Sequence, residues 1–493
     1  MLAWTIYLCW IGAIGLLLLP RQSAREARWL ALSATVAAAA LAVIGALGHA
    51  PDEGVMTVVQ KPWIVPLGIE FHLAVDGISL ALLLLTGVAS IAGVLFSWNV
   101  THRSTEFFAL YLVLIGAVYG VFLSFDLFLL FAFYELVIVP KYLLIAIWGK
   151  GARAYAAMKL ALYTFAGSAL VLLGMVAVFV MAGADTMNLL VLAERPLPLE
   201  FQTWALPVMW IGFAVLAGVW PLHTWAPTGH VAAPTAASML LAGVIMKLGA
   251  YGALRTSITL FPDALQVWQG PFGYLAAAGI VYAAGVSLVQ RDFKYVIGYS
   301  SVSHMGFVLL GLVSLNGLGT AGAVLQMVSH GVLAGLLFAV VGRMVHDRVH
   351  TRDLEDLRGL NLRRQLPFVA VVFGLASLAA AGFPGFSGFV AELSVLSGSW
   401  RDLPVATILA GFGILLGMGY SLRAVNAAFL DISPVAVGPT KVLPSVTVPE
   451  KVGAAMLLGF SLWIGLYPQW MLGLITSSYQ SPLWKVLIEK GGW

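Results

Sequence analysis

The segment 131–149 places two oppositely charged side chains inside an otherwise apolar run. Its sequence is FAFYELVIVPKYLLIAIWG, in which Glu135 and Lys141 lie six residues apart. Each charge costs about 2.5–3.5 kcal/mol at the centre of a bilayer on insertion scales, so such residues mark pairs or proton and ion paths. On an ideal helix the two side chains lie roughly 120° apart. They can approach only if Pro140, between them, kinks or unwinds the turn.

Further ionisable side chains lie inside apolar segments. A set of carboxylate, amine and imidazole groups is what a proton relay needs, because burial and neighbouring charges shift the pKa of each group and allow it to exchange protons. Imidazole begins closest to neutral pH. Besides Glu135 and Lys141, the candidates for a proton path are His223, His230, Lys247, His304, His330 and Glu392.

Several of these residues have a structural alternative. Lys247 lies four residues before Tyr251 and eight before Arg255, so its amine could extend along the helix to the membrane surface. Asp76 and Asp126 stand at the starts of apolar runs. An acid there stabilises the helix dipole, and we interpret both as structural.

The histidines and the second carboxylate also have alternative roles. His223 and His230 flank prolines, where freed backbone groups need hydrogen-bond partners. His304 and His330 could cap or cross-link helices. Glu392 follows an interruption directly and could cap the next half-helix, although a carboxylate beside unwound backbone is also typical of ion sites.

Composition defines the class of protein. Of the 493 residues, 61% are hydrophobic and 10% are charged, whereas an average soluble domain is about 25% charged. Apolar runs of about 20 residues can each cross a bilayer, and they predict an all-α, polytopic membrane protein with fourteen transmembrane helices. The predicted spans begin at Met1, Trp29, Gly77, Phe107, Leu127, Tyr155, Trp204, Val231, Gly273, Val296, Ala321, Phe368, Val405 and Val452.

Basic residues predict the orientation. Arginines follow the first apolar run, at Arg21, Arg25 and Arg28, which predicts an uncleaved helix with its N-terminus outside. The odd-numbered connections are then cytoplasmic and hold most of the Lys and Arg, including RMVHDRVHTRDLEDLRGLNLRRQ at 343–365. Both termini are expected on the periplasmic side of a bacterial inner membrane. This bias accounts for the net charge of +4, and no basic stripe indicates a nucleic-acid partner.

Cysteine usage limits the cofactors. The single cysteine is Cys9, inside the first span. This chain alone therefore cannot build a disulfide, an iron–sulfur cluster or a cysteine-based zinc site. The glycine-rich sequence at 382–389, GFPGFSGF, lies in a membrane segment without the flanking residues of a phosphate loop. We expect no cofactor or metal in this chain.

Two membrane segments, 219–252 and 376–398, are interrupted by proline and glycine. Paired broken helices are typical of inverted-repeat transporters, with the ion path near the midplane. The breaks lie five predicted helices apart, which indicates two repeats of five helices each. Because five is odd, the second repeat begins on the opposite side of the membrane and has the opposite orientation. The chain therefore divides into leading helices (1–105), a first five-helix repeat (106–254), a second, inverted repeat (271–428) and a closing helix (429–493).

These segments resemble the antiporter-like membrane subunits of respiratory complex I, most closely the M-type chain, over residues 76–428. The matching sequences are ELVIVPKYLLIAIWG, WPLHTWAPTGHVAAPTAASMLLAGVIMKLGAYGALR, VIGYSSVSHMGFVLLG, QMVSHGVLAGLLF and GFPGFSGFVAELSVL. The resemblance implies fourteen helices with two inverted repeats and membership of a proton-pumping NADH:quinone oxidoreductase. It also implies flavin and iron–sulfur clusters in partner subunits, and L-type and N-type antiporter-like chains as neighbours in the membrane.

The resemblance also implies the proton-path residues. The positions that match the family pattern are Glu135, Lys247, His304, His330 and Glu392. Two positions depart from it: the family usually has a lysine where this chain has Leu216, and the acid common before the second motif histidine is absent from the sequence PTGH at 227–230. Lys141 stands where the family commonly has an apolar residue. We hypothesise that Lys141 supplies the amine that Leu216 lacks.

The predicted function is proton translocation in the membrane arm of an NADH:quinone oxidoreductase. Glu135 is the switchable carboxylate, Lys247 the central carrier, and His304 and His330 the links to Glu392. Two alternatives stay open. One is a subunit of a cation/proton antiporter or an ion-pumping hydrogenase of the same fold, which fold and motifs alone do not separate. The other is a scaffold that no longer pumps, because Leu216 replaces the expected lysine.

Overall fold

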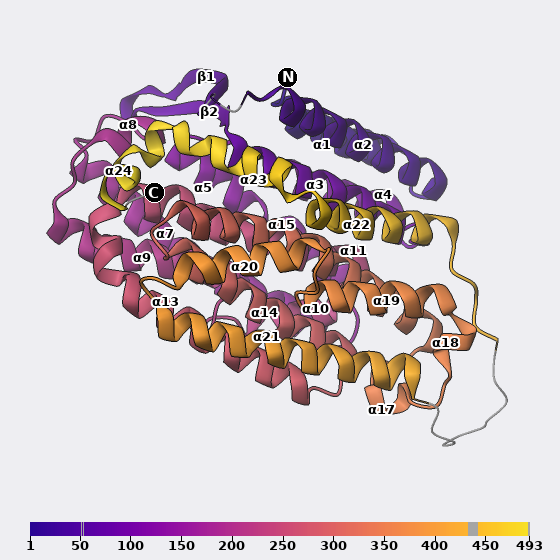
Figure 1. Ribbon diagram of the computed structural model, residues 1–493. Helices are drawn as coiled ribbons and strands as arrows, with labels where there is room; N and C mark the ends of the chain where they lie inside the picture. The colour runs from indigo at the N-terminus through magenta and orange to yellow at the C-terminus, as the bar shows by residue number, and fades with distance from the viewer. Residues whose placement is uncertain (51, 53, 432–441, 492–493) are drawn as a thin grey trace.

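Helices dominate the structure because apolar segments in a membrane satisfy their backbone hydrogen bonds most directly as helices. The computed structural model describes residues 1–50, 52, 54–431 and 442–491. Its long helices run side by side along one direction (Figure 1). A β-hairpin lies at one end of the bundle, and the short helices α17 (Leu354–Leu357) and α18 (Leu362–Gln365) lie at the other. We call these the hairpin end and the basic end.

The leading part contains three helices and the hairpin. In the hairpin, β1 and β2 pair antiparallel, with Met56 opposite Val75 and Ile64 opposite Ile69. The apolar runs that begin at Trp29 and Gly77 predict only a connection between them, and the hairpin lies in it. The elements are α1 (Trp4–Leu18), α2 (Ala24–Gly48), β1 (Met56–Ile64), η1 (Val65–Leu67), β2 (Ile69–Val75) and α3 (Gly77–Phe96).

The middle of the chain forms the next group of helices, in which the short helix 189–194 lies outside the predicted spans and the short helix 225–232 follows a break. They are α4 (Ser104–Leu123), α5 (Leu127–Leu136), α6 (Ile138–Trp148), α7 (Arg153–Met181), α8 (Leu189–Glu194), α9 (Leu199–Ala217), α10 (Trp225–Ala232), α11 (Thr235–Leu240), η2 (Leu241–Ile245), α12 (Met246–Gly252) and η3 (Ala253–Ile258).

The rest of the chain forms a third group and a closing group. The third group is α13 (Pro262–Val289), α14 (Phe293–Leu312), α15 (Gly317–Ala339), η4 (Val340–His346), α16 (Asp347–Val349), α17, α18, α19 (Pro367–Ala380), α20 (Ser387–Ser399), α21 (Pro404–Val425) and η5 (Asn426–Leu430). The closing group is α22 (Val448–Leu466), α23 (Pro468–Ser477), η6 (Ser478–Gln480) and α24 (Pro482–Gly491).

The helices coincide with the predicted spans. Within the described residues, 11 helices are long and apolar enough to cross a membrane, or 12 when α22 and α23, bent by 80°, count as one span. The two other predicted spans correspond to the shorter apolar helices α1 and α19, so the number fourteen stays a prediction. The predicted and observed starts differ most at the ninth span. The helix expected to begin at Gly273 begins at Pro262 and continues through the exposed Pro271.

The structure also contains the predicted interruptions. Non-helical backbone separates α9 from α10 and α19 from α20, and the second break contains Gly382 (φ 74°) and Gly385 (φ 95°). Helix α5 gives way to α6 at Val137, where Pro140 removes the hydrogen bond to Leu136. The π-helical segments η2 and η3, which the sequence analysis did not predict, flank Lys247 on α12. Such segments are frequent at functional sites.

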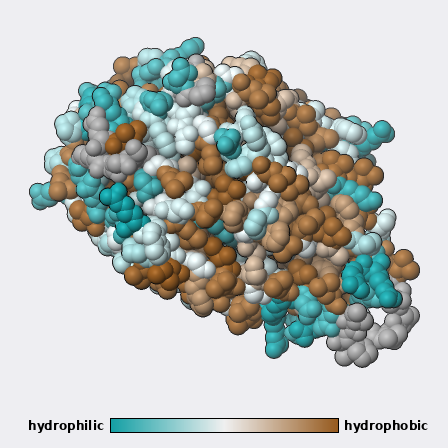
Figure 2. Space-filling view, viewed as in Figure 1, coloured by the Kyte–Doolittle hydropathy of each residue, from teal (hydrophilic) through white to brown (hydrophobic). Residues whose placement is uncertain are grey.

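The connections gather by parity, as predicted. Odd-numbered connections meet at the basic end, where Arg28 donates to the Val100 carbonyl and Lys150 pairs with Asp347. Even-numbered connections meet at the hairpin end, where Leu73 bridges Ser124 and Asp126 bridges Asn188. Figure 2 shows hydrophobic residues across the middle of the molecule and hydrophilic residues toward both ends. The parity and the apolar middle fit a membrane that lies across the helices between the two ends.

Candidate functional site

A buried lysine and a buried histidine form the centre of the site. Lys247 lies on α12 and is completely buried, and its Nζ lies 2.8 Å from His330 Nδ1 on α15. The Nζ also donates to the Ala242 carbonyl one turn back. Because its amine points to His330, Lys247 does not extend to the membrane surface, and that alternative is wrong.

Two further residues continue the line away from Lys247. The imidazole rings of His330 and His304, on α14, stack with their centroids 5.3 Å apart and an interplanar angle of 27°. His304 Nδ1 lies 3.4 Å from Glu392 Oε1 on α20. Glu392, at one end of this line, lies on the helix that follows the second break, and Lys247, at the other end, lies between two π-helical segments. We call Lys247, His330, His304 and Glu392 the central line.

An amide also contacts the line at His304. The Gln326 side-chain amide lies 3.2 Å from His304 Nδ1, the same ring nitrogen that lies 3.4 Å from Glu392. Which of the two groups donates depends on the tautomer of the ring. His304 Nε2 has no hydrogen-bond partner within the described residues.

Small cavities accompany the second half of the line. One, lined by Ser300, His304, His330 and Glu392, has a volume of about 10 Å³, which is room for about one water molecule. A second cavity of similar size, about 10 Å³, lies between Glu392 and Tyr420 on α21. A water molecule in each would extend the path from the imidazoles past the carboxylate, since water bridges transmit protons between groups beyond direct contact.

Glu135 and Lys141 form a separate group on α5 and α6. Lys141 is 1% exposed, so its amine points into the protein and not into lipid. The Ser168 hydroxyl on α7 and the Lys141 ammonium both act on the Glu135 carboxylate at longer range. Within the described residues, neither of them has a hydrogen-bond partner, and the same is true of Glu135 Oε1. Buried polar atoms without protein partners are typical water sites.

Helix α9 contacts neighbours of both polar groups. The Tyr134 ring, beside Glu135, meets the Phe213 ring edge to face at 5.7 Å. Gly249, on the helix of Lys247, packs so closely on α9 that an added Cβ would lie 2.5 Å from the Phe213 carbonyl oxygen. Leu216 is 1% exposed on the same segment of α9. The position expected to carry a lysine therefore belongs to a buried helix segment that packs against the helix of Lys247.

The two motif histidines have different surroundings. His223 lies at the first break, with its ring edge-on to Tyr282 at 5.6 Å and to Tyr299 at 6.0 Å. His230, on α10, is completely buried, and its ring lies 4.9 Å from that of Phe338. Neither ring nitrogen of His230 has a hydrogen-bond partner within the described residues. The His230 ring therefore does not form the hydrogen bond to freed backbone groups that its structural alternative requires.

Some polar residues of the interior were missed or misplaced by sequence reasoning. Arg255 is completely buried on η3 and pairs with the equally buried Asp76. Asp76 and Asp126 do cap their helices, as predicted, by accepting from the Ser79 and Leu129 amides at 2.9 Å. An arginine at helical spacing after a buried lysine was the available signal. For Gln326 and Ser168 no sequence signal distinguishes them from other polar helix residues.

The arrangement can relay protons. The central line offers an amine, two imidazoles and a carboxylate in succession, and each can accept and release a proton. Within the described residues, no group of three or more His, Cys, Asp or Glu side chains has a geometry that could hold a metal ion. The chemistry that these residues support is therefore proton transfer through the membrane interior.

Proteins of known families are similar to this chain in amino-acid sequence. The family model described as NADH:quinone oxidoreductase/Mrp antiporter, TM, matches residues 124–417. NADH-quinone oxidoreductase subunit M of Rhodobacter capsulatus is 37% identical over 470 residues, covering 92% of this chain and 90% of that protein. The subunit M of Escherichia coli K12 is 36% identical over 487 residues, covering 95% of each.

A solved structure agrees with these relatives. A chain of respiratory complex I from Thermus thermophilus with bound NADH superposes with a TM-score of 0.88 at 27% identity, covering 98% of this chain and 100% of that chain. The residues that match the family model include the two breaks, the group of Glu135 and Lys141, and the central line. The chain therefore belongs to the transmembrane family shared by NADH:quinone oxidoreductases and Mrp antiporters.

Proposed function

We propose that this chain is the M-type, proton-translocating subunit of the membrane arm of an NADH:quinone oxidoreductase. The observation that carries the proposal is the central line, in which Lys247 contacts His330 at 2.8 Å and His304 lies 3.4 Å from Glu392. These contacts join α12 to α15 and α14 to α20. The names and coverage of the subunit M relatives support the same conclusion.

The chain acts in an enzyme complex without performing the redox step itself. Electron transfer from NADH to quinone takes place in partner subunits, which we propose carry the flavin and iron–sulfur clusters. L-type and N-type antiporter-like chains are its proposed neighbours. The redox step changes charge along the membrane arm, and a buried pair such as Glu135 and Lys141 responds by exchanging protons, since a local charge change biases a two-state element.

We expect purification of the tagged chain from its native membrane to test this assignment. The purified complex should contain flavin and iron–sulfur absorbance and should oxidise NADH with quinone as acceptor. In vesicles, its proton uptake should require both NADH and quinone. Sodium/proton exchange without a redox substrate, in a complex that lacks flavin and iron–sulfur clusters, would contradict the proposal and support the antiporter alternative.

The proposed location is the bacterial inner membrane, with the hairpin end periplasmic and the basic end cytoplasmic. We expect a cysteine at Lys61, on exposed β1, to react with a membrane-impermeant maleimide added to whole cells. A cysteine at Glu355, exposed on α17, should react only in inverted vesicles. The native Cys9 is completely buried and serves as the background control. The opposite labelling pattern would refute the orientation.

A further inference from the structure

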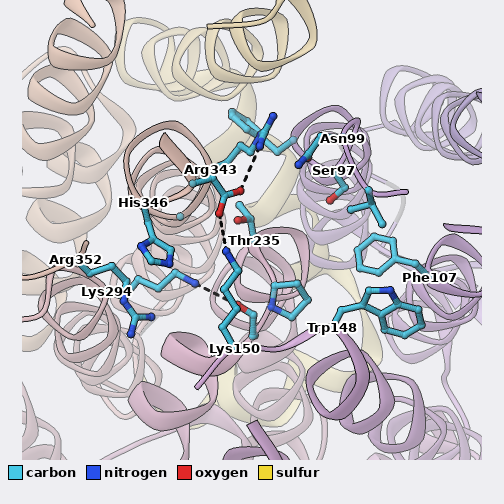
Figure 3. A pocket seen from close by; sticks show the side chains of 16 residues that line it. Ser97, Asn99, Phe107, Trp148, Lys150, Thr235, Lys294, Arg343, His346 and Arg352 are labelled. Atoms are coloured by element: carbon cyan, nitrogen blue, oxygen red, sulfur yellow. Dashed lines mark hydrogen bonds and ion pairs between the residues drawn. The ribbon is translucent and has the colours of Figure 1, made fainter. Parts of the chain in front are cut away.

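A cavity opens at the basic end between segments that are far apart in the sequence. Its volume is about 190 Å³, which is room for several water molecules. Residues from the ends of α3 and α6, the starts of α11 and α14, and η4 form its wall (Figure 3). Its basic side chains are Lys150, Lys294, Arg343, His346 and Arg352.

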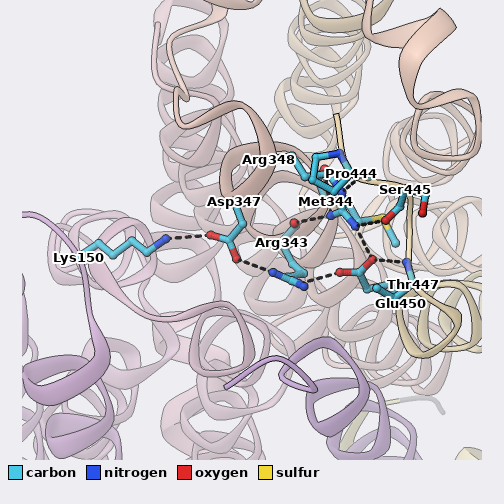
Figure 4. A network of polar contacts seen from close by, with 9 residues as sticks. All are labelled: Lys150, Arg343, Met344, Asp347, Arg348, Pro444, Ser445, Thr447 and Glu450. Carbon is cyan, nitrogen blue, oxygen red and sulfur yellow. Dashed lines mark hydrogen bonds and ion pairs between the residues drawn. The ribbon is translucent and has the colours of Figure 1, made fainter. Parts of the chain in front are cut away.

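Three of these basic side chains are occupied by ion pairs. Asp347 lies 2.8 Å from Lys150 and 3.3 Å from Arg343, and Glu450 on α22 lies 2.6 Å from Arg343 (Figure 4). Arg352 pairs with Asp292 at 3.2 Å. These pairs fix the wall of the cavity, and they neutralise most of its positive charge.

Lys294 differs from them. It is 4% exposed, and its Nζ donates to the Ala233 carbonyl at 3.2 Å. Within the described residues it has no ion pair with a carboxylate. The stem of the lysine passes Gly342, where an added Cβ would lie 3.3 Å from Lys294 Cε and 2.8 Å from Thr235 Oγ1. The glycine thus leaves room for the lysine to reach inward from the cavity.

Beyond Lys294 lies His230. Ala233, which accepts from Lys294, caps the helix α10 that carries His230. The His230 ring is completely buried, and both Lys294 and Lys247 are close enough to act on it electrostatically. His330 is also within electrostatic range of His230. The geometric link is the Ala233 carbonyl, which accepts from Lys294 at the end of the helix that carries the buried and unpartnered ring of His230.

We propose that Lys294 is the proton-exchanging residue through which protons from the cavity enter the central line. The Lys294 ammonium transfers a proton through water to a ring nitrogen of His230, and the neutral amine takes a replacement proton from water in the cavity. His230 then passes the proton to the neutral amine of Lys247. The inference rests on the proposed function and adds the site at which protons enter the central line.

The test depends on a difference between lysine and arginine. Both carry a positive charge and donate hydrogen bonds, but arginine does not release its proton in proteins. We expect Lys294→Arg and Lys294→Met, in the complete complex in vesicles, each to lower proton pumping at least about tenfold. Lys451→Arg, at an exposed lysine on α22 outside the cavity, is the matched control and should pump at the native rate. Native pumping by Lys294→Arg would show that a fixed charge suffices and would overturn the proposal.

A second measurement does not depend on variants of Lys294. Asn99 is exposed at the wall of the cavity, and Asn99→Cys can be labelled with a bulky thiol reagent in inverted vesicles. Complete labelling should inhibit pumping, whereas unchanged pumping would overturn the proposal. The proposed function itself is tested by Lys247→Met. If Lys247→Met abolishes pumping but Lys294→Arg pumps normally, the proposed function stands and the role of Lys294 as the entry residue is wrong.

Discussion

Lys247→Met is expected to lower NADH-driven proton pumping and turnover at least about tenfold, while the complex still assembles. In the native chain, Lys247 Nζ lies 2.8 Å from His330 Nδ1. Methionine has a similar length but no exchangeable proton, so in the variant the proton path ends at His330. Assembly should survive because the change removes a buried amine without leaving a charge unpaired. The measurements are the rate of NADH oxidation and the number of protons pumped per electron in reconstituted vesicles.

The matched control is Lys451→Met, at an exposed lysine at the start of α22. It makes the same chemical change outside the proton path and should leave both quantities unchanged. If Lys247→Met pumps with the native rate and stoichiometry, Lys247 is not the central carrier. The scaffold alternative then becomes the better description of this chain.

Lys141→Met is expected to impair pumping about as much as Glu135→Gln, and Lys141→Met combined with Leu216→Lys is expected to restore it. Lys141 is buried, acts on the Glu135 carboxylate and has no hydrogen-bond partner within the described residues. Water between amine and carboxylate would complete a proton-exchanging pair. Leu216 lies on α9, which contacts Tyr134, next to Glu135, and Gly249, near Lys247, so a lysine there provides a buried amine on that helix. Coupled pumping in vesicles measures all three variants.

Leu216→Lys alone provides the control for the rescue. It adds a second buried amine without removing the first, and burial disfavours the charged form of an amine. We therefore expect no gain over the native chain. A harmless Lys141→Met, or a double variant no more active than Lys141→Met, would rule out the relocation of the amine from Leu216 to Lys141.

Much of the site could be predicted because the membrane makes charged residues informative. Glu135, Lys141, Lys247 and Glu392 stood out in apolar runs, and the structure buries or half-buries each of them. Lys294 did not stand out, because it lies at the start of its helix beside an arginine and an aspartate. Its role depends on Ala233 and Gly342, which approach it from other helices and carry no chemical signal in the sequence.

The sequence by itself determined the class of protein, the positions of the helices, the two breaks and the parity of the connections. These follow from local quantities: apolar length, proline and glycine, and the bias of basic residues. Only the tertiary structure decided which ionisable groups meet. The contact between Lys247 and His330, and that between His304 and Glu392, join different helices. The rotation of each helix about its axis sets such contacts, and it depends on packing against all of its neighbours.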